Sequence, residues 1–180
     1  MSSIVVANFN PDYAKKIAAA LRSNGLYVGE ICTTGAQVMN FTARHYHGGV
    51  VICSMKLRDM SAVNLPRITG NGYDYLFLVS SRFSEMCESL EHACLILPVN
   101  RMMLISTVNM LLDLSKPTPL SLKKKLVSGK YDDKRLIADA KGFLMERIHF
   151  TEAQAHHFLQ KKSMDTGKKM GETAMMILSS

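Results

Sequence analysis

The chain has 180 residues, of which 47% are hydrophobic, a size and composition that fit one folded domain of ordinary size and a smaller one. It contains no apolar run of about 18 residues, and its start (MSSIVVANFN) lacks a basic stretch followed by an apolar segment, so we expect no membrane span, no export and a cytoplasmic location. The formal net charge of +7 is unevenly divided, because residues 1–114 carry 9 basic and 8 acidic side chains whereas residues 115–180 carry 13 and 7. This asymmetry favours an anionic partner for the C-terminal third, although a solvated basic surface would also explain it.

Residues 1–115 alternate short apolar runs with amphipathic segments. The run Gly49–Cys53 is continuous and rich in β-branched residues, which is typical of a strand covered on both faces. The predicted strands are residues 4–7, 26–31, 49–53, 75–79 and 94–97, and the predicted helices are residues 11–24, 36–46, 62–68, 83–91 and 102–114. Pro11 is expected near the first turn of its helix, and Pro66 is expected to kink the third one. Five strand–helix pairs predict an α/β domain with a doubly wound, five-stranded parallel sheet.

The alternation ends at residues 116–130, where the two prolines of SKPTPL mark a linker with a short basic helical piece after it. Residues 131–180 then predict a small all-α unit of three helices. Its second helix has a start signal in FTEAQA, where Thr151 can cap the helix and Gln154 can return the hydrogen bond. A turn at MDTGKK, capped by Asp165 or Thr166, leads into the third helix. Such a small unit is marginal alone, so a partner or a second copy is expected.

The segment RLIADAKGFLMERIHFTEAQAHHFLQKKSMDTGKKMGETAMMIL resembles the ANTAR family of RNA-binding transcription antiterminators. The resemblance is carried by AKGFLM (Ala140–Met145), EAQA (Glu152–Ala155) and FLQKKSM (Phe158–Met164), at the family's spacings. The preceding α/β part resembles a CheY-like receiver domain of two-component signalling. Together they imply a regulator that binds paired stem-loops in nascent mRNA and prevents a competing terminator hairpin from forming.

The resemblance also implies a homodimer with one three-helix unit for each hairpin. The pairing element is predicted to be an apolar seam at helical spacing, Ile137, Ala140, Leu144 and Ile148, extended upstream through Leu122 and Leu126.

The receiver resemblance fails at the positions that carry phosphorylation chemistry. These positions hold Asn8 and Phe9 for the acidic pair, Ser54 for the phosphoacceptor and Leu97 for the lysine, and only Ser80 fits its slot. Mg²⁺ prefers carboxylate oxygens, and a serine without an adjacent base is a poor nucleophile. Asp12 and Asp59 lie nearby but end no apolar strand. We therefore predict a pseudo-receiver that is not phosphorylated on Asp and has no metal or cofactor. We expect it to be regulated by dimerisation, a protein partner or a small ligand.

The candidate RNA-binding residues are Lys141, Arg147, Lys161, Lys162, Lys168 and Lys169. Lys161 and Lys162 are predicted near a helix C-terminus, where the macrodipole favours cations for structural reasons alone. Lys168 and Lys169 are predicted in the first turn of the last helix, where exposed amides and two ammonium groups can seat a phosphate. The planar guanidinium of Arg147 can stack on an unpaired base.

Three further residues match the family but have competing interpretations. Gly142 costs about 1 kcal/mol relative to alanine inside a helix, so we expect a neighbouring helix or an RNA loop to approach its backbone. Met145 and Met164 are interpreted as core residues.

No catalytic constellation is found, and the scattered cysteines and histidines predict no metal site. Two alternatives to RNA binding stay open, a DNA-binding response regulator and an adaptor whose tail only dimerises.

Overall fold

The computed structural model describes residues 3–70, 72–116 and 132–179. The sheet domain (residues 3–116) is built on β1 (Ser3–Ala7), β2 (Val28–Cys32), β3 (Gly49–Ser54), β4 (Tyr73–Ser80) and β5 (Ala93–Leu97). All four neighbouring pairs are parallel, in the order β2-β1-β3-β4-β5. The predicted doubly wound, five-stranded parallel sheet is confirmed.

Side chains that alternate along each strand form two apolar layers, one on each face of the sheet. On one face Ile4 and Val6 pack with α1 (Pro11–Arg22) and α5 (Arg101–Leu114). On the other face Val5 and Ala7 pack with α2 (Gly35–Arg44) and α3 (Leu65–Thr69), and with Cys87 of α4 (Met86–Ser89). Both faces of a strand such as β1 are therefore buried, as its continuous apolar run predicts.

Two predicted helices are shorter than expected. Residues 62–68 form a 3₁₀ turn, Ala62–Asn64, followed by the short α3. Pro66 lies at the start of α3, where a missing N–H costs no intrahelical bond, so it begins the helix and does not kink it. Residues 83–91 form the end of another 3₁₀ turn, Ser81–Phe83, and the single-turn α4, because only Cys87 and Leu90 supply buried anchors there.

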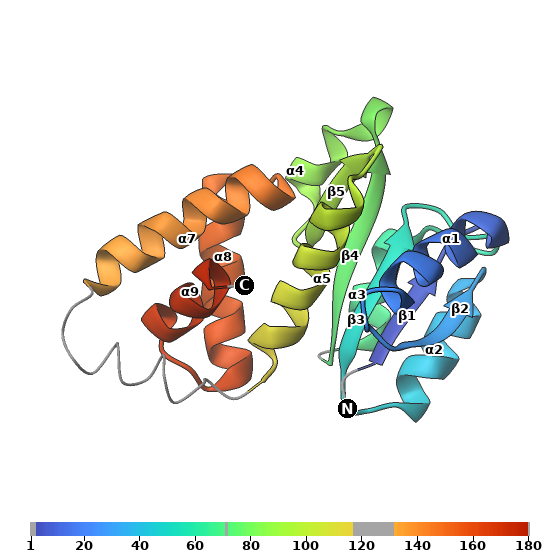
Figure 1. Cartoon of the computed structure of the whole chain (residues 1–180), viewed down its shortest axis with the longest axis horizontal. Helices are drawn as coiled ribbons and strands as arrows, with labels where there is room; N and C mark the ends of the chain where they lie inside the picture. The colour runs from blue at the N-terminus through green and yellow to red at the C-terminus, as the bar shows by residue number, and fades with distance from the viewer. Residues whose placement is uncertain (1–2, 71, 117–131, 180) are drawn as a thin grey trace.

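The three-helix unit consists of α7 (Asp133–Ile148), α8 (Glu152–Thr166) and α9 (Met170–Leu178). The predicted capping box of α8 is present, with the Thr151 N–H donating to Gln154 Oε1 over 2.8 Å and the Gln154 N–H donating to Thr151 Oγ1 over 3.3 Å. Figure 1 shows the unit beside α5, outside the sheet layers. Among the described residues, no helix is both long enough and apolar enough to span a membrane.

The turn before α9 differs from the prediction. Helix α8 continues through Asp165 and Thr166 and ends at Gly167, whose φ of 63° is the left-handed conformation that glycine favours. Lys169 is the N-cap residue of α9, so Lys168 and Lys169 precede this helix and do not lie in its first turn.

The predicted pairing seam is part of the core of the three-helix unit. Ala140, Leu144 and Ile148 are fully buried, with 0% exposure, and Ile137 packs against the same apolar cluster. In this arrangement the seam is covered by the chain's own helices, so it does not offer the exposed pairing face that we expected. Leu122, Leu126 and the linker beyond residue 116 lie outside the described residues.

The interpretations of the glycine and the methionines also need correction. A Cβ at Gly142 would meet no heavy atom of the described residues within 4 Å, so no described helix approaches the backbone there. Close approach occurs instead at Gly171, where a Cβ would contact the carboxyl group of Asp133. Met145 and Met164 are 41% and 75% exposed and are not core residues.

Candidate nucleic-acid interface

The carboxyl ends of the strands bring the degenerate phosphorylation positions to one edge of the sheet. Asn8 is buried after β1 and its Oδ1 accepts the Asn10 N–H over 2.9 Å, whereas Phe9 is 55% exposed. Ser54 ends β3 and donates from Oγ to the Lys56 carbonyl over 2.8 Å. Ser80 and Leu97 end β4 and β5. Across the described residues, no group of three His, Cys, Asp or Glu side chains could hold a metal ion.

The two acids near this edge belong to helix starts. Asp59 accepts the Gly35 N–H over 2.7 Å and the Ala36 N–H over 3.1 Å, and these bonds hold its pKa below the usual range of a carboxyl group. It thereby satisfies free amides at the start of α2. Asp12 is exposed in the first turn of α1. Arg58 Nε donates to the Phe9 carbonyl over 3.1 Å, which brings a cation to the edge.

The basic candidates of the three-helix unit fall into two groups by their contacts. Lys141, Arg147 and Lys169 make their described contacts within the unit. Lys141 Nζ lies 2.8 Å from Glu152 Oε1, an ion pair that joins α7 to α8 and lowers the pKa of Glu152. The guanidinium of Arg147 lies over the Phe143 ring, 4.7 Å from its centroid. Lys169 is exposed, and its backbone N–H donates to Glu172 Oε2 over 3.1 Å.

Lys162 and Lys168 instead reach the sheet domain. Lys162 forms an ion pair with Asp74 of β4, and the two side chains retain only 12% and 16% of their exposure. Burial raises the pKa of Asp74, and the Lys162 ammonium opposes this rise. Lys161, the neighbouring candidate, is half-buried and borders the same junction.

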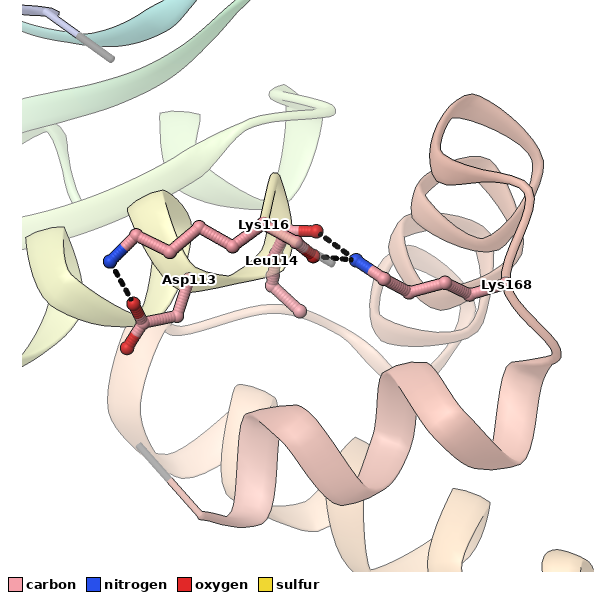
Figure 2. A network of polar contacts seen from close by, with 4 residues as sticks. All are labelled: Asp113, Leu114, Lys116 and Lys168. Atoms are coloured by element: carbon pink, nitrogen blue, oxygen red, sulfur yellow. Dashed lines mark hydrogen bonds and ion pairs between the residues drawn. The ribbon is translucent and has the colours of Figure 1, made fainter. Parts of the chain in front are cut away.

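Lys168 caps the C-terminal end of α5. Its Nζ donates to the carbonyls of Leu114 and Lys116 over 2.7 and 2.5 Å (Figure 2). A cation is favourable at this end of a helix, where carbonyl groups have no intrahelical partner. Burial lowers the pKa of Lys168. Lys116 itself turns away to pair with Asp113 over 2.7 Å, as the same view shows.

Gln154 provides a third polar contact between the two parts. While its Oε1 completes the capping box of α8, its Nε2 donates towards the carbonyls of Cys87, Glu88 and Leu90, at 3.2, 2.7 and 2.6 Å. These carbonyls lie in and after the single-turn α4, where few intrahelical bonds satisfy them.

Apolar side chains and a cavity complete the junction between the sheet domain and the three-helix unit. One continuous apolar cluster runs from α5 into all three C-terminal helices. Beside it lies a cavity of about 380 Å³, lined among others by His92, Phe158 and Lys161. Burial and the cations of Lys161 and Lys162 lower the pKa of His92 to about 4.

Sequence reasoning missed Asp74, Gln154 and the end of α5 as contacts between the sheet domain and the three-helix unit. Asp74 had a visible signal, because an acid in the run YDYLFLV is unusual for a strand buried on both faces. Gln154 was assigned only its capping role, and nothing in the sequence indicates that its amide nitrogen serves the other domain.

Comparisons with known proteins agree with the two parts of the fold. A family model described as "ANTAR domain" matches residues 127–178. A CheY-like response regulator receiver domain protein from Methanospirillum hungatei is similar in structure with a TM-score of 0.52 at 12% identity, over 62% of this chain and 94% of its own. A receiver domain protein from Bacillus halodurans has a TM-score of 0.51 at 20% identity, over 64% of this chain and 97% of its own.

RcsB from Salmonella enterica serovar Typhimurium, solved bound to promoter P1flhDC, has a TM-score of 0.50 at 13% identity and covers 93% of this chain and 93% of its own. A search of curated protein sequences gave no match. At these identities the structural neighbours establish the receiver fold and no activity.

Proposed function

Because residues 127–178 are an ANTAR domain that follows a domain with the receiver fold, we propose that this chain is an RNA-binding regulator of transcription antitermination. The family match is the observation that carries the proposal. In this function two three-helix units, one from each copy of the chain, bind a pair of stem-loops in a nascent mRNA leader. Holding them folded prevents the overlapping terminator hairpin from forming, so polymerase continues. The ANTAR family is a family of transcription regulators, and we propose no enzymatic activity.

The RNA-contacting face is proposed to include the exposed family positions of α7 and α8. Gly142 faces open space, and Met145 and Met164 leave large apolar side chains exposed. An open backbone and uncovered apolar side chains suit the splayed bases of a hairpin loop. Arg147 adds a planar cation that can stack on a base.

The lysines supply the phosphate contacts of this proposal. Lys161 and Lys169 can do so in the present arrangement, since neither ammonium group forms a described hydrogen bond or ion pair. Lys141 would exchange Glu152 for a phosphate. Lys162 and Lys168 join them when their contacts with the sheet domain are released.

The receiver-like domain is proposed to act without phosphorylation on Asp. Asn8 and Phe9 supply no carboxylate for Mg²⁺, Ser54 replaces the phosphoacceptor, and Leu97 cannot neutralise a phosphoryl group. Asp59 is engaged with the amides of α2. Regulation would instead come from dimerisation, a protein partner or a small ligand at this domain.

We propose a homodimer in the cytoplasm as the working form, with one three-helix unit for each hairpin. Because the seam of α7 is buried inside the chain, the pairing surface in this arrangement must include other residues.

Selection from RNAs with two short stem-loops and randomised loops, followed by gel-shift titration, tests the function. We expect one loop sequence to be enriched and bound more tightly than duplex DNA of equal length at equal salt. Preference for duplex DNA would support a DNA-binding regulator instead. Binding of neither nucleic acid would support an adaptor.

A further inference from the structure

We propose that the receiver-like domain silences the ANTAR domain by docking against it and occupying Lys162 and Lys168, so that RNA binding requires the two domains to separate. This inference rests on the proposed RNA binding. It concerns a closed state of the chain in which part of the cationic surface already has an internal partner.

The ion pair of Lys162 with Asp74 is the first reason. Both side chains are largely buried, so the ammonium group cannot reach a phosphate while the pair is intact. Exposed pairs such as Lys15–Asp12, with 70% and 82% exposure, exchange easily with other ions. The buried pair must instead be broken before Lys162 becomes available, and leaving either charge buried alone is strongly unfavourable.

Lys168 is withheld by a different group. Its ammonium donates two hydrogen bonds to the carbonyl oxygens at the end of α5, as seen in Figure 2. These oxygens present concentrated negative partial charge, the same kind of partner that a phosphate offers. One ammonium group has only three donors, so carbonyl and phosphate compete for it.

Gln154 holds the N-terminal end of α8 against the receiver-like domain through hydrogen bonds of a neutral amide group. Its Nε2 lies within hydrogen-bonding distance of three carbonyls around α4. Since a primary amide has two hydrogens, this contact ties one side chain of the ANTAR domain to most of a turn of the receiver-like domain. Together the three contacts hold both ends of α8 and the turn before α9.

The docked state is suited to reversal. The three polar contacts lie around the apolar cluster that joins α5 to the ANTAR domain. When the domains separate, the released polar groups can form hydrogen bonds with water or with RNA. Domain junctions with a large polar share resemble transient interfaces. If only a fraction of molecules is open, the apparent affinity for RNA falls by that fraction.

The variant Gln154→Glu tests the inference in the full chain. A glutamate keeps the acceptor of the capping box, so α8 retains its start. It loses the amide donor and places a carboxylate against three carbonyl oxygens, which should separate the domains. The added negative charge would by itself weaken RNA binding, so tighter binding can only come from opening.

Two variants serve as matched controls. Gln37→Glu makes the same change in the capping box of α2, where the amide nitrogen has no described partner in the ANTAR domain. Gln160→Glu adds the same charge to the exposed surface of α8. The probe is a labelled RNA with two stem-loops and randomised loops, and small-angle X-ray scattering reports the radius of gyration.

We expect Gln154→Glu to increase the radius of gyration and to tighten RNA binding about tenfold. Gln37→Glu should leave both unchanged, and Gln160→Glu should leave the radius unchanged and weaken binding slightly. An enlarged Gln154→Glu chain that binds RNA no better than wild type would overturn the inference while RNA binding stands. A wild-type chain already as extended as the variant would overturn it too. No RNA binding by the opened variant would instead refute the proposed function.

Discussion

The buried ion pair between Asp74 and Lys162 should be energetically coupled, and a double-mutant cycle measures this. Removing one partner of a buried pair typically costs about 3–5 kcal/mol, because the other charge stays buried alone. Here the side chains of Asp74 and Lys162 are 16% and 12% exposed, and Lys162 can reach water when the domains separate. We therefore expect Asp74→Asn or Lys162→Met to lower the free energy of unfolding by a smaller amount, about 2 kcal/mol. The double variant should cost less than the sum, with a coupling energy of about 1–3 kcal/mol.

Urea unfolding of the full chain, followed by circular dichroism, provides the four free energies of unfolding. The exposed pair Asp113–Lys116, with 45% and 61% exposure, is the matched control and should show a coupling of about 0.5 kcal/mol or less. Equal, near-zero coupling in both cycles would refute the view that the domains are docked through Asp74.

Three further predictions concern single residues. The fold lowers the pKa of His92 to about 4, so between about pH 7 and pH 5 the unfolded chain binds a proton that the folded chain does not. The wild-type chain should therefore lose stability as the pH falls through this range, and His92→Gln should abolish that loss. In urea unfolding at a series of pH values, the free energy of unfolding of wild type should fall by about 2 kcal/mol more than that of the variant. Asp74 titrates in both proteins and cancels in this comparison, and parallel pH profiles would contradict a buried neutral His92. Gly142→Ala should raise the free energy of unfolding by about 0.5–1 kcal/mol, because the new Cβ enters open space. Gly171→Ala should raise it less, because Asp133 must move to make room. A lower stability of Gly142→Ala in thermal unfolding would contradict an open face at this position. Lys169→Ala should reduce the slope of log affinity against log salt by about 0.7 in RNA titrations, and an unchanged slope would remove Lys169 from the interface.

The sequence predicted the architecture because local signals and burial agree there. The apolar run Gly49–Cys53 required a strand covered on both faces, and β3 lies at the centre of the sheet. The pair Thr151 and Gln154 specified the start of α8 through bonds between neighbouring residues. Short-range geometry of this kind can be read from spacing alone.

The candidate site was less predictable, since its contacts join residues far apart in the chain. Lys162 and Lys168 could be recognised as cations, but their partners could not. Lys162 pairs with the carboxylate of Asp74, 88 positions earlier in the chain, and Lys168 donates to the backbone carbonyl of Leu114, 54 positions earlier. Met145 and Met164 have apolar side chains at helical spacing, and periodicity does not tell a core face from one kept open for a partner. Gly142 was singled out for close approach, yet the close contact is at Gly171 because α9 meets the first turn of α7.

Hydrogen–deuterium exchange of the full chain, with and without a selected two-hairpin RNA, shows whether RNA binding releases the receiver-like domain. Coupling of RNA binding to domain release should slow exchange in α7 and α8 when RNA is bound, and should speed exchange in α4 and in the last turn of α5. Protection confined to the sheet domain, or unchanged exchange throughout α7, α8 and α9 at saturating RNA, would contradict it.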